Sequence, residues 1–198
     1  DGFHLWSERY DRELDDIFAI QDEIALAITE KLKVSLLGKD RELITKSHTQ
    51  NTDAYQYYLQ GRYSWNKRHE EGLETALHYF QKALDQDPDY ALAWVGLADT
   101  YLLLSEYGTM SRSKIYPKAK GAITRALEID PNLPEAHISL ASLLMFDEWD
   151  WIRAGQEFKW GVEHNPNYAT AHHWYSEWLL YSGQFEESLK EISRAIEL

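Results

Sequence analysis

The sequence predicts an all-α protein in which antiparallel pairs of helices stack side by side. Three observations support this fold class. A proline-containing turn recurs along the chain, apolar residues lie at helical spacing between these turns, and a triplet of small, large and small side chains is repeated four times. Taken together, these patterns predict tandem helical repeats.

The recurring turn divides most of the chain into units. It occurs at residues 87–90 (DPDY), 130–133 (DPNL) and 165–168 (NPNY). Proline cannot continue a helix, because it lacks the N–H group and disfavours helical geometry in the residue before it. We expect the polar residue after each proline (Asp89, Asn132 or Asn167) to cap the next helix by accepting from its free N–H groups. Each turn therefore marks one helix end and one helix start.

The segments between the turns carry two apolar patterns. The first helix of a unit has a stripe spaced by three and four residues: Trp94, Leu97, Ala98 and Tyr101; His137, Leu140, Ala141 and Leu144; His172, Tyr175, Ser176 and Leu179. The second helix has the small–large–small triplet: Ala76, Phe80 and Ala83; Ala119, Ile123 and Ala126; Ala154, Phe158 and Gly161; Ser188, Ile192 and Ala195. Such a triplet lets two helices approach closely around one bulky side chain.

These residues resemble the tetratricopeptide repeat (TPR) family from about residue 51 to residue 198. The resemblance implies a right-handed TPR superhelix, an α-solenoid, with units at about 51–88, 89–131, 132–166 and 167–198. The second unit carries about nine extra residues between Leu104 and Lys118, relative to the usual period of about 34. In the first unit the register stays open, since either Gly61 fills the small position or Leu59 and Tyr63 fill the large ones.

Residues 1–50 do not share the repeat. A helix is predicted from about residue 13 to residue 36, followed by a polar linker, and this helix either caps the solenoid or mediates dimer or interdomain contacts. Residues 1–37 also resemble the junction after a TolB-like domain in bacterial signalling proteins. There the TPR units follow an α/β domain, and an adenylate-cyclase, DNA-binding or kinase domain lies further upstream. The resemblance implies that residues 1–50 end a preceding domain and that the rest is an interaction or sensor region.

Composition excludes several classes of function. The 198 residues carry a formal net charge of −13 with no basic face, which argues against direct nucleic-acid binding. No apolar stretch approaches the roughly 18 residues of a membrane-spanning helix. With no cysteine, disulfides and thiol chemistry are excluded. We expect a cytoplasmic location, or a periplasmic one if the parent protein has a membrane span upstream.

No residue pattern predicts catalysis, a metal or a cofactor. Phosphate-binding, zinc-protease and nucleophile-elbow motifs are absent from the sequence. His172 and His173 point about 100° apart on a helix, so they cannot easily share a metal with His137. The acidic loop at residues 147–150 lacks the ligands and glycine of a calcium loop, and Asp150 is expected to cap the following helix. We therefore expect a non-catalytic protein.

The family resemblance places a ligand groove on the first helices of the units, where a peptide or protein segment would bind. The expected groove residues mix apolar, aromatic and charged side chains: Tyr58, Arg62, Trp65, Val95, Asp99, Leu102, Ile138, Ser142, Met145, His173, Glu177 and Leu180. Arg62 is the only basic residue among them, so a clamp for a terminal carboxylate is not expected.

Self-association is the alternative function. Helix 184–198 should expose Leu189, Ile192 and Ile196, and the helix at 13–36 offers Ile17, Ile24 and Ile28. A homodimer through either surface would make the chain an oligomerisation or scaffold domain that positions an upstream effector. A third reading is the regulatory region of a nucleotide cyclase.

Overall fold

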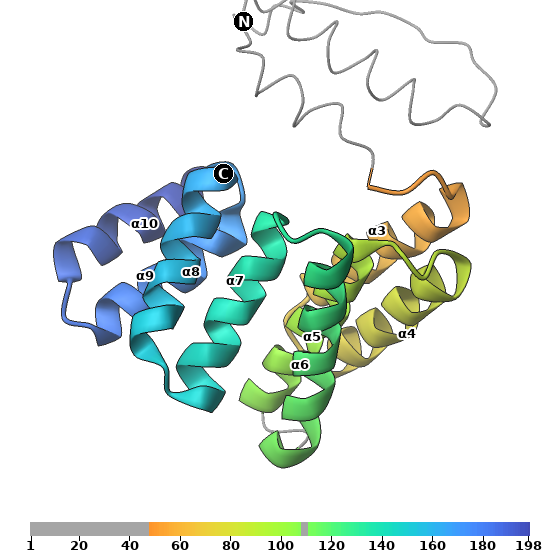
Figure 1. The fold of residues 1–198 in the computed structure, drawn as a ribbon, viewed down its shortest axis with the longest axis horizontal. Coiled ribbons are helices and arrows are strands. Elements are labelled where there is room, and N and C mark those ends of the chain that lie inside the picture. Colours follow the sequence, from red (N-terminus) through yellow and green to blue (C-terminus); the bar gives the residue numbers. More distant parts are fainter. Residues whose placement is uncertain (1–47, 108–110) are drawn as a thin grey trace, which may run out of the picture. The chain divides into compact units, whose positions relative to one another are not determined.

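A computed structural model describes residues 48–107 and 111–198, and every regular element in these ranges is a helix (Figure 1). The chain divides after Thr52, and the following concerns the unit Asp53–Leu198 together with the start of its first helix. The predicted helix at 13–36, with Ile17, Ile24 and Ile28, lies outside the described residues. The segment that resembles a TolB-like junction also lies outside them.

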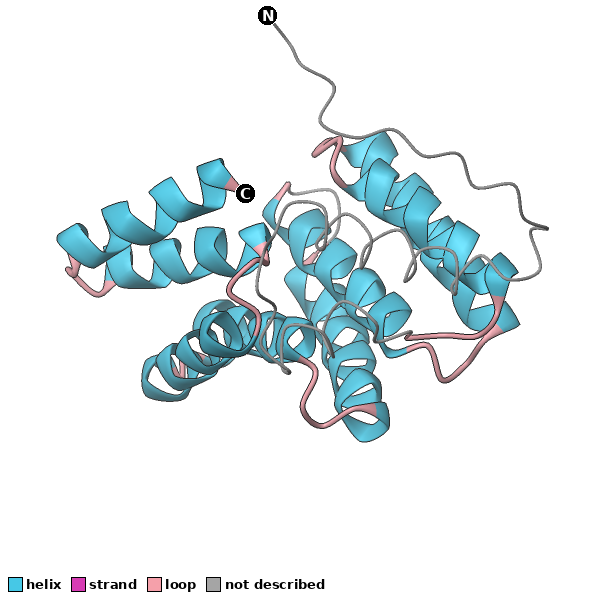
Figure 2. Ribbon diagram, turned by 90° about the horizontal axis from the view of Figure 1, so that it is seen from above, coloured by secondary structure: helices cyan, strands magenta, loops and turns pink. Residues whose placement is uncertain are grey.

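The described helices follow one another as hairpins joined by short loops (Figure 2). Each predicted unit contributes a first and a second helix, and in the third unit the first helix ends in a π-helical turn. In chain order the elements are α3 (Thr52–Trp65), α4 (Glu70–Gln86), α5 (Ala91–Glu106), α6 (Arg112–Ile129), α7 (Pro134–Leu143), η2 (Leu144–Glu148), α8 (Trp151–His164), α9 (Ala169–Tyr181) and α10 (Phe185–Glu197).

Phe80 of α4 shows how one bulky side chain holds three helices together. Its ring lies against Gly61 of α3 and Gly96 of α5, and a Cβ atom added to Gly61 would come within 2.6 Å of the ring. Both glycines therefore let their helices approach α4 closely. Gly61 occupies the small position of the first unit, whereas Leu59 and Tyr63 are exposed, which decides between the two registers.

The other second-helix triplets are buried in the same way, except the last. The triplet positions of α4, α6 and α8 are fully or almost fully buried, because the first helix of the following unit packs against each of these helices. In α10, Ser188 is buried, but Ile192 and Ala195 are only partly so. No helix in the described part of the chain follows α10 to cover them.

The proline turns end and restart helices as predicted, but the capping residue is different. The N-cap positions of α5, α7 and α9 are Tyr90, Leu133 and Tyr168, which form no side-chain cap hydrogen bond. The expected caps Asp89, Asn132 and Asn167 are therefore wrong. In the first two turns the residue before the proline stabilises the turn itself: the carboxylates of Asp87 and Asp130 accept from the backbone N–H two residues ahead, each at 3.1 Å.

A ring nitrogen at the same position of three units binds the preceding proline turn. Trp94 Nε1 donates to the carbonyl of Pro88 at 2.8 Å, and His137 Nε2 and His172 Nε2 donate to those of Pro131 and Pro166 at 2.9 and 3.0 Å. The Nδ1 atoms of the two histidines lie 2.6 and 2.5 Å from Oε2 of Glu157 and Glu191. Each of these two histidines therefore links its helix to a proline turn and to the second helix of its unit.

Three of the turns inside the units contain a residue in the left-handed conformation. Gly183 has a φ of 77° before α10, as suits glycine, whereas Arg68 and Trp149 adopt φ values of 54° and 58°. In the second unit the extra residues lengthen the second helix, which begins at Arg112 and contains Pro117. The basic residues Arg112, Lys114, Lys118 and Lys120 are therefore helical.

Candidate functional site

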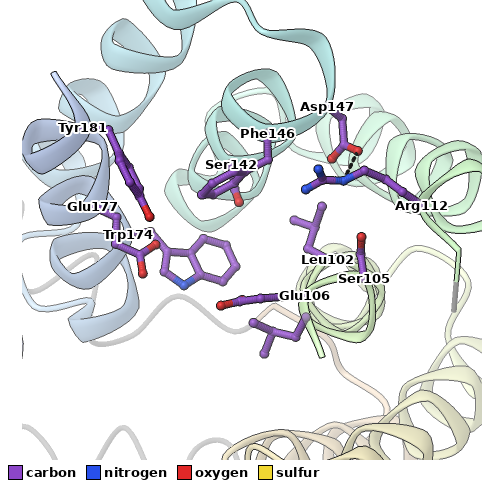
Figure 3. Close-up of a pocket in the computed structure, with 11 residues that line it drawn as sticks. Leu102, Ser105, Glu106, Arg112, Ser142, Phe146, Asp147, Trp174, Glu177 and Tyr181 are labelled. Atoms are coloured by element: carbon purple, nitrogen blue, oxygen red, sulfur yellow. Dashed lines mark ion pairs between the residues drawn. The ribbon is translucent and has the colours of Figure 1, made fainter. Parts of the chain in front are cut away.

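A pocket of about 250 Å³ lies where the first helices of three successive units meet (Figure 3). The helices α5, α7 with η2, and α9 each supply part of its wall, and α6 supplies one side chain. The residues that line it are Leu102, Leu103, Ser105, Glu106, Arg112, Ser142, Phe146, Asp147, Trp174, Glu177 and Tyr181.

The π-helical turn η2 brings two of these residues to the pocket. This turn ends with the N–H of Asp150 donating to the carbonyl of Leu144 at 3.0 Å, and Trp149 closes it in a left-handed conformation. The wider turn changes the direction of the side chains after α7, so Phe146 and Asp147 both reach the pocket. Asp150 then caps α8 by accepting from the N–H of Arg153 at 3.1 Å, as predicted.

Arg112, at the first turn of α6, is the only cation among the described residues that lines the pocket, and it is already paired. Its Nε lies 3.0 Å from Oδ1 of Asp147 (Figure 3). Burial raises the pKa of the Asp147 carboxyl, and the charge of Arg112 acts in the opposite direction. The pair therefore adds shape and hydrogen-bonding groups to the wall but little net charge.

The opposite wall is aromatic and acidic. Trp174, Glu177 and Tyr181 follow one another along α9, and Glu106 extends toward them from the end of α5 (Figure 3). Burial raises the pKa of Glu177 to about 7; the charge of Glu106 also raises it, and that of Arg68 lowers it. Glu177 Oε1 lies 3.6 Å from His173 Nε2, and burial lowers the pKa of His173. Near neutral pH this contact therefore supplies little countercharge.

Three of the predicted groove residues line this pocket, and five others are buried. Leu102, Ser142 and Glu177 are pocket residues. Tyr58, Arg62 and His173 are partly exposed outside it, and Leu180 is exposed. The buried residues offer no surface to a partner, which corrects the expectation that they line a groove: Trp65, Val95, Asp99, Ile138 and Met145.

Asp99, the buried charged residue of this set, connects the first helices of three units through Ser139 and Arg62. Asp99 of α5 accepts a hydrogen bond from Ser139 Oγ of α7 at 2.5 Å, and Arg62 Nη1 of α3 lies 3.6 Å from Asp99 Oδ2. The Asp99 side chain is completely buried. This cluster therefore fixes the spacing of the helices whose ends form the pocket, without contacting the pocket itself.

The prediction from sequence missed most of the pocket. Glu106, Arg112, Phe146, Asp147, Trp174 and Tyr181 were not among the expected groove residues. One signal was present, since Trp174, Glu177 and Tyr181 are spaced by three and four residues on a single helical face. The π-helical turn gave no such signal.

The self-association residues of α10 differ in exposure. The side chains of Leu189 and Ile196 are 66% and 80% exposed, while Ile192 is partly buried.

Within residues 48–107 and 111–198, no group of three or more His, Asp or Glu side chains is arranged to hold a metal ion. No helix in these ranges is long and apolar enough to cross a membrane.

Two curated proteins are similar to this chain in sequence. "Putative adenylate cyclase 3" of Rhizobium meliloti is 29% identical over 154 residues, covering 77% of this chain and 25% of the relative. "Transcriptional regulator HilA" of Salmonella typhimurium is 26% identical over 201 residues, covering all of this chain and 35% of the relative. The chain thus spans about a quarter to a third of these relatives.

A family model and a solved structure match the repeat region. The model described as "Tetratricopeptide repeat" matches residues 79–110. A thermophilic TPR protein of Thermus thermophilus superposes with a TM-score of 0.60 at 14% identity, covering 89% of this chain and 90% of that one. With the stacked hairpins and their interlocking triplets, these matches show that the described helices form a tetratricopeptide-repeat solenoid.

Proposed function

We propose that this chain binds a segment of a partner protein at the pocket formed by α5, η2 and α9. The TPR fold is a fold of protein–protein interaction, and this supports a binding role rather than catalysis. One observation carries the proposal: three successive units contribute to one cavity, so a single bound segment would contact all three. Aromatic side chains such as Trp174 and Tyr181 are typical anchors of such interfaces.

A random peptide library displayed on phage and panned against the purified chain tests this proposal. Selected peptides are then synthesised, and their affinities are measured by fluorescence anisotropy. Tyr181→Ala removes an exposed side chain at the pocket, and we expect it to weaken these peptides by about tenfold. Tyr63→Ala, on α3 and equally exposed, is the matched control and should bind normally. Peptides that ignore Tyr181→Ala, or a library that yields none, would contradict the proposal.

The chain is proposed to perform this binding within a bacterial signalling or regulatory protein. The names of the two curated relatives support this, since one is called an adenylate cyclase and the other a transcriptional regulator. In such a protein the TPR units would present the effector domain to its partner, or regulate a cyclase. In the whole protein, Tyr181→Ala should then change effector output without changing its abundance, whereas Tyr63→Ala should change neither.

Self-association through α10 is a second candidate function. Leu189 and Ile196 lie on a strongly amphipathic helix and are largely exposed. A second copy would cover them with the same face, as in a symmetric dimer. Light scattering over a dilution series tests this: a concentration-dependent dimer that is lost in the double variant Leu189→Asp/Ile196→Asp supports it, and a monomer throughout refutes it.

A further inference from the structure

We propose that the pocket between α5, η2 and α9 accepts a basic side chain of the partner segment, preferring arginine to lysine. This inference rests on the proposed function, because it names the chemistry of the residue that fills the same pocket. The argument uses the volume of the pocket, its aromatic wall and the arrangement of its charges.

The volume suits one long side chain. At about 250 Å³ the cavity is smaller than the 300–1,000 Å³ typical of small-molecule sites, and it cannot enclose a helix. It opens between helix ends, so a partner backbone can remain outside while one side chain enters. An arginine or lysine side chain has the length to reach the inner wall from there.

The aromatic residues of the wall favour a cation. Trp174 and Tyr181 of α9 and Phe146 of η2 all line the cavity (Figure 3). Aromatic faces attract cations through their negative quadrupole, with tryptophan the strongest partner. The planar guanidinium of arginine also stacks on such rings, whereas the ammonium of lysine does not.

The charges of the pocket also favour a cation. Glu106 and Glu177 approach from different helices, and neither faces a lysine or arginine partner among the described residues. Arg112 is paired with Asp147, so it does not neutralise them. The charge of Arg68 acts on Glu177, but its guanidinium is stacked 3.7 Å above the Trp65 ring and does not line the pocket.

A bound cation would therefore relieve an existing electrostatic cost. The exposed carboxylate of Glu106 repels the partly buried carboxylate of Glu177, and a cation between them replaces this repulsion by two attractive pairs. Arginine presents donors on several sides of one plane, so it can contact both carboxylates together. An acidic or purely apolar side chain would leave both carboxylates without a lysine or arginine partner.

The same phage selection separates this inference from the proposed function. Peptides whose binding depends on Tyr181 should share an arginine at the anchoring position. Replacing this arginine by lysine should weaken binding several-fold, and replacing it by norleucine by tenfold or more. Tyr181-dependent peptides that share an acidic or apolar anchor instead would overturn this inference while leaving the proposed function intact.

Variants of the chain test the two carboxylates directly. Glu106→Gln and Glu177→Gln keep the side-chain shape and remove one charge each, and we expect each to weaken arginine peptides about three- to tenfold. Glu74→Gln, an exposed glutamate on α4, is the matched control and should have no effect. Circular dichroism confirms that each variant is folded. Unchanged affinity in both folded pocket variants would refute the inference.

Discussion

Arg62 Nη1 on α3 lies 3.6 Å from Asp99 Oδ2 on α5, and the Asp99 side chain is completely buried. Burial raises the pKa of Asp99 to about 6, although the charge of Arg62 and the hydrogen bond from Ser139 act in the opposite direction. The folded protein therefore binds a proton at Asp99 more readily than the unfolded chain does. Keeping Asp99 charged in this contact, which aligns three units, therefore costs folding free energy, and the cost grows as the pH rises.

Replacing Asp99 by asparagine should remove this pH dependence. Since its folded pKa is raised from 3.8, Asp99 favours folding most below pH 4, and this contribution is lost as the pH rises through 6. Urea unfolding of wild type and Asp99→Asn between pH 4 and pH 7 measures it. As the pH rises, the unfolding free energy of wild type should fall relative to that of Asp99→Asn by on the order of 2 kcal/mol. A difference that is constant over this range would contradict the prediction.

Gly96→Ala should destabilise the chain, although alanine is the better helix former. The new methyl group would collide with the ring of Phe80, and overpacking costs about 1–3 kcal/mol against a gain in helix propensity of about 1 kcal/mol. Gly121→Ala is the control, because no atom lies within 4 Å of its added Cβ. Thermal unfolding should show a lower midpoint for the first variant and an equal or higher one for the second.

Trp149 closes the π-helical turn at a φ of 58°, a conformation that costs a residue with a Cβ about 1–2 kcal/mol. Trp149→Gly should relieve this cost, whereas Trp149→Ala should keep it. Both variants lose the ring, so the difference between them reports on the backbone conformation. We therefore expect the glycine variant to be more stable than the alanine variant by about 0.5–1 kcal/mol, after the extra backbone entropy of glycine. Equal urea midpoints for the two variants would show that the turn is not strained.

His172→Ala should loosen the last helix pair. The ring donates to the Pro166 carbonyl at 3.0 Å and lies 2.5 Å from Glu191 Oε2 on α10, so both partners lose a contact. We expect a loss of about 2–3 kcal/mol in unfolding free energy, measured by urea titration. His78→Ala, at an exposed position of α4, should change it by less than about 0.5 kcal/mol.

Binding of an arginine peptide should strengthen as the pH rises from about 6 to about 8. Burial raises the pKa of Glu177 to about 7, so its negative charge develops over this range. The groups that act on it are Glu106 of α5, Arg68 of the α3–α4 turn and its own neighbour His173. Glu177→Gln should flatten the profile, whereas His173→Gln should leave the rise in place. An unchanged profile in Glu177→Gln would contradict this assignment.

Most of the fold could be predicted because its determinants are local. Phe80, Ile123 and Phe158 lie between small residues at fixed intervals, and each is buried between helices. The capping residues were predicted wrongly at the proline turns. The aspartates before two of the prolines bind N–H groups within the turn, and the helices after the turns begin without a side-chain cap hydrogen bond.

The site was harder to predict, because it depends on contacts between units. Helical spacing placed Val95, Ile138 and Met145 on one side of their helices, and they do share it. They are nonetheless buried, because Ile138 packs against Gly161 of α8, and Val95 lies in one cluster with Ala126 of α6 and Ala136 of α7. How closely successive first helices approach is decided by the packing of whole units. The pocket therefore forms at the helix ends, at Glu106 and Tyr181, where this packing stops.

The insertion of Phe80 between Gly61 and Gly96 also limits how this protein can be recombined. Ser139 and Trp174 occupy, in the third and fourth units, the position that Gly96 holds in the second. A unit carrying Phe80, if duplicated or moved along the array, would meet a side chain where it now meets bare backbone. The units are thus not interchangeable modules, and engineered versions of the array would have to move Phe80 together with Gly61 and Gly96.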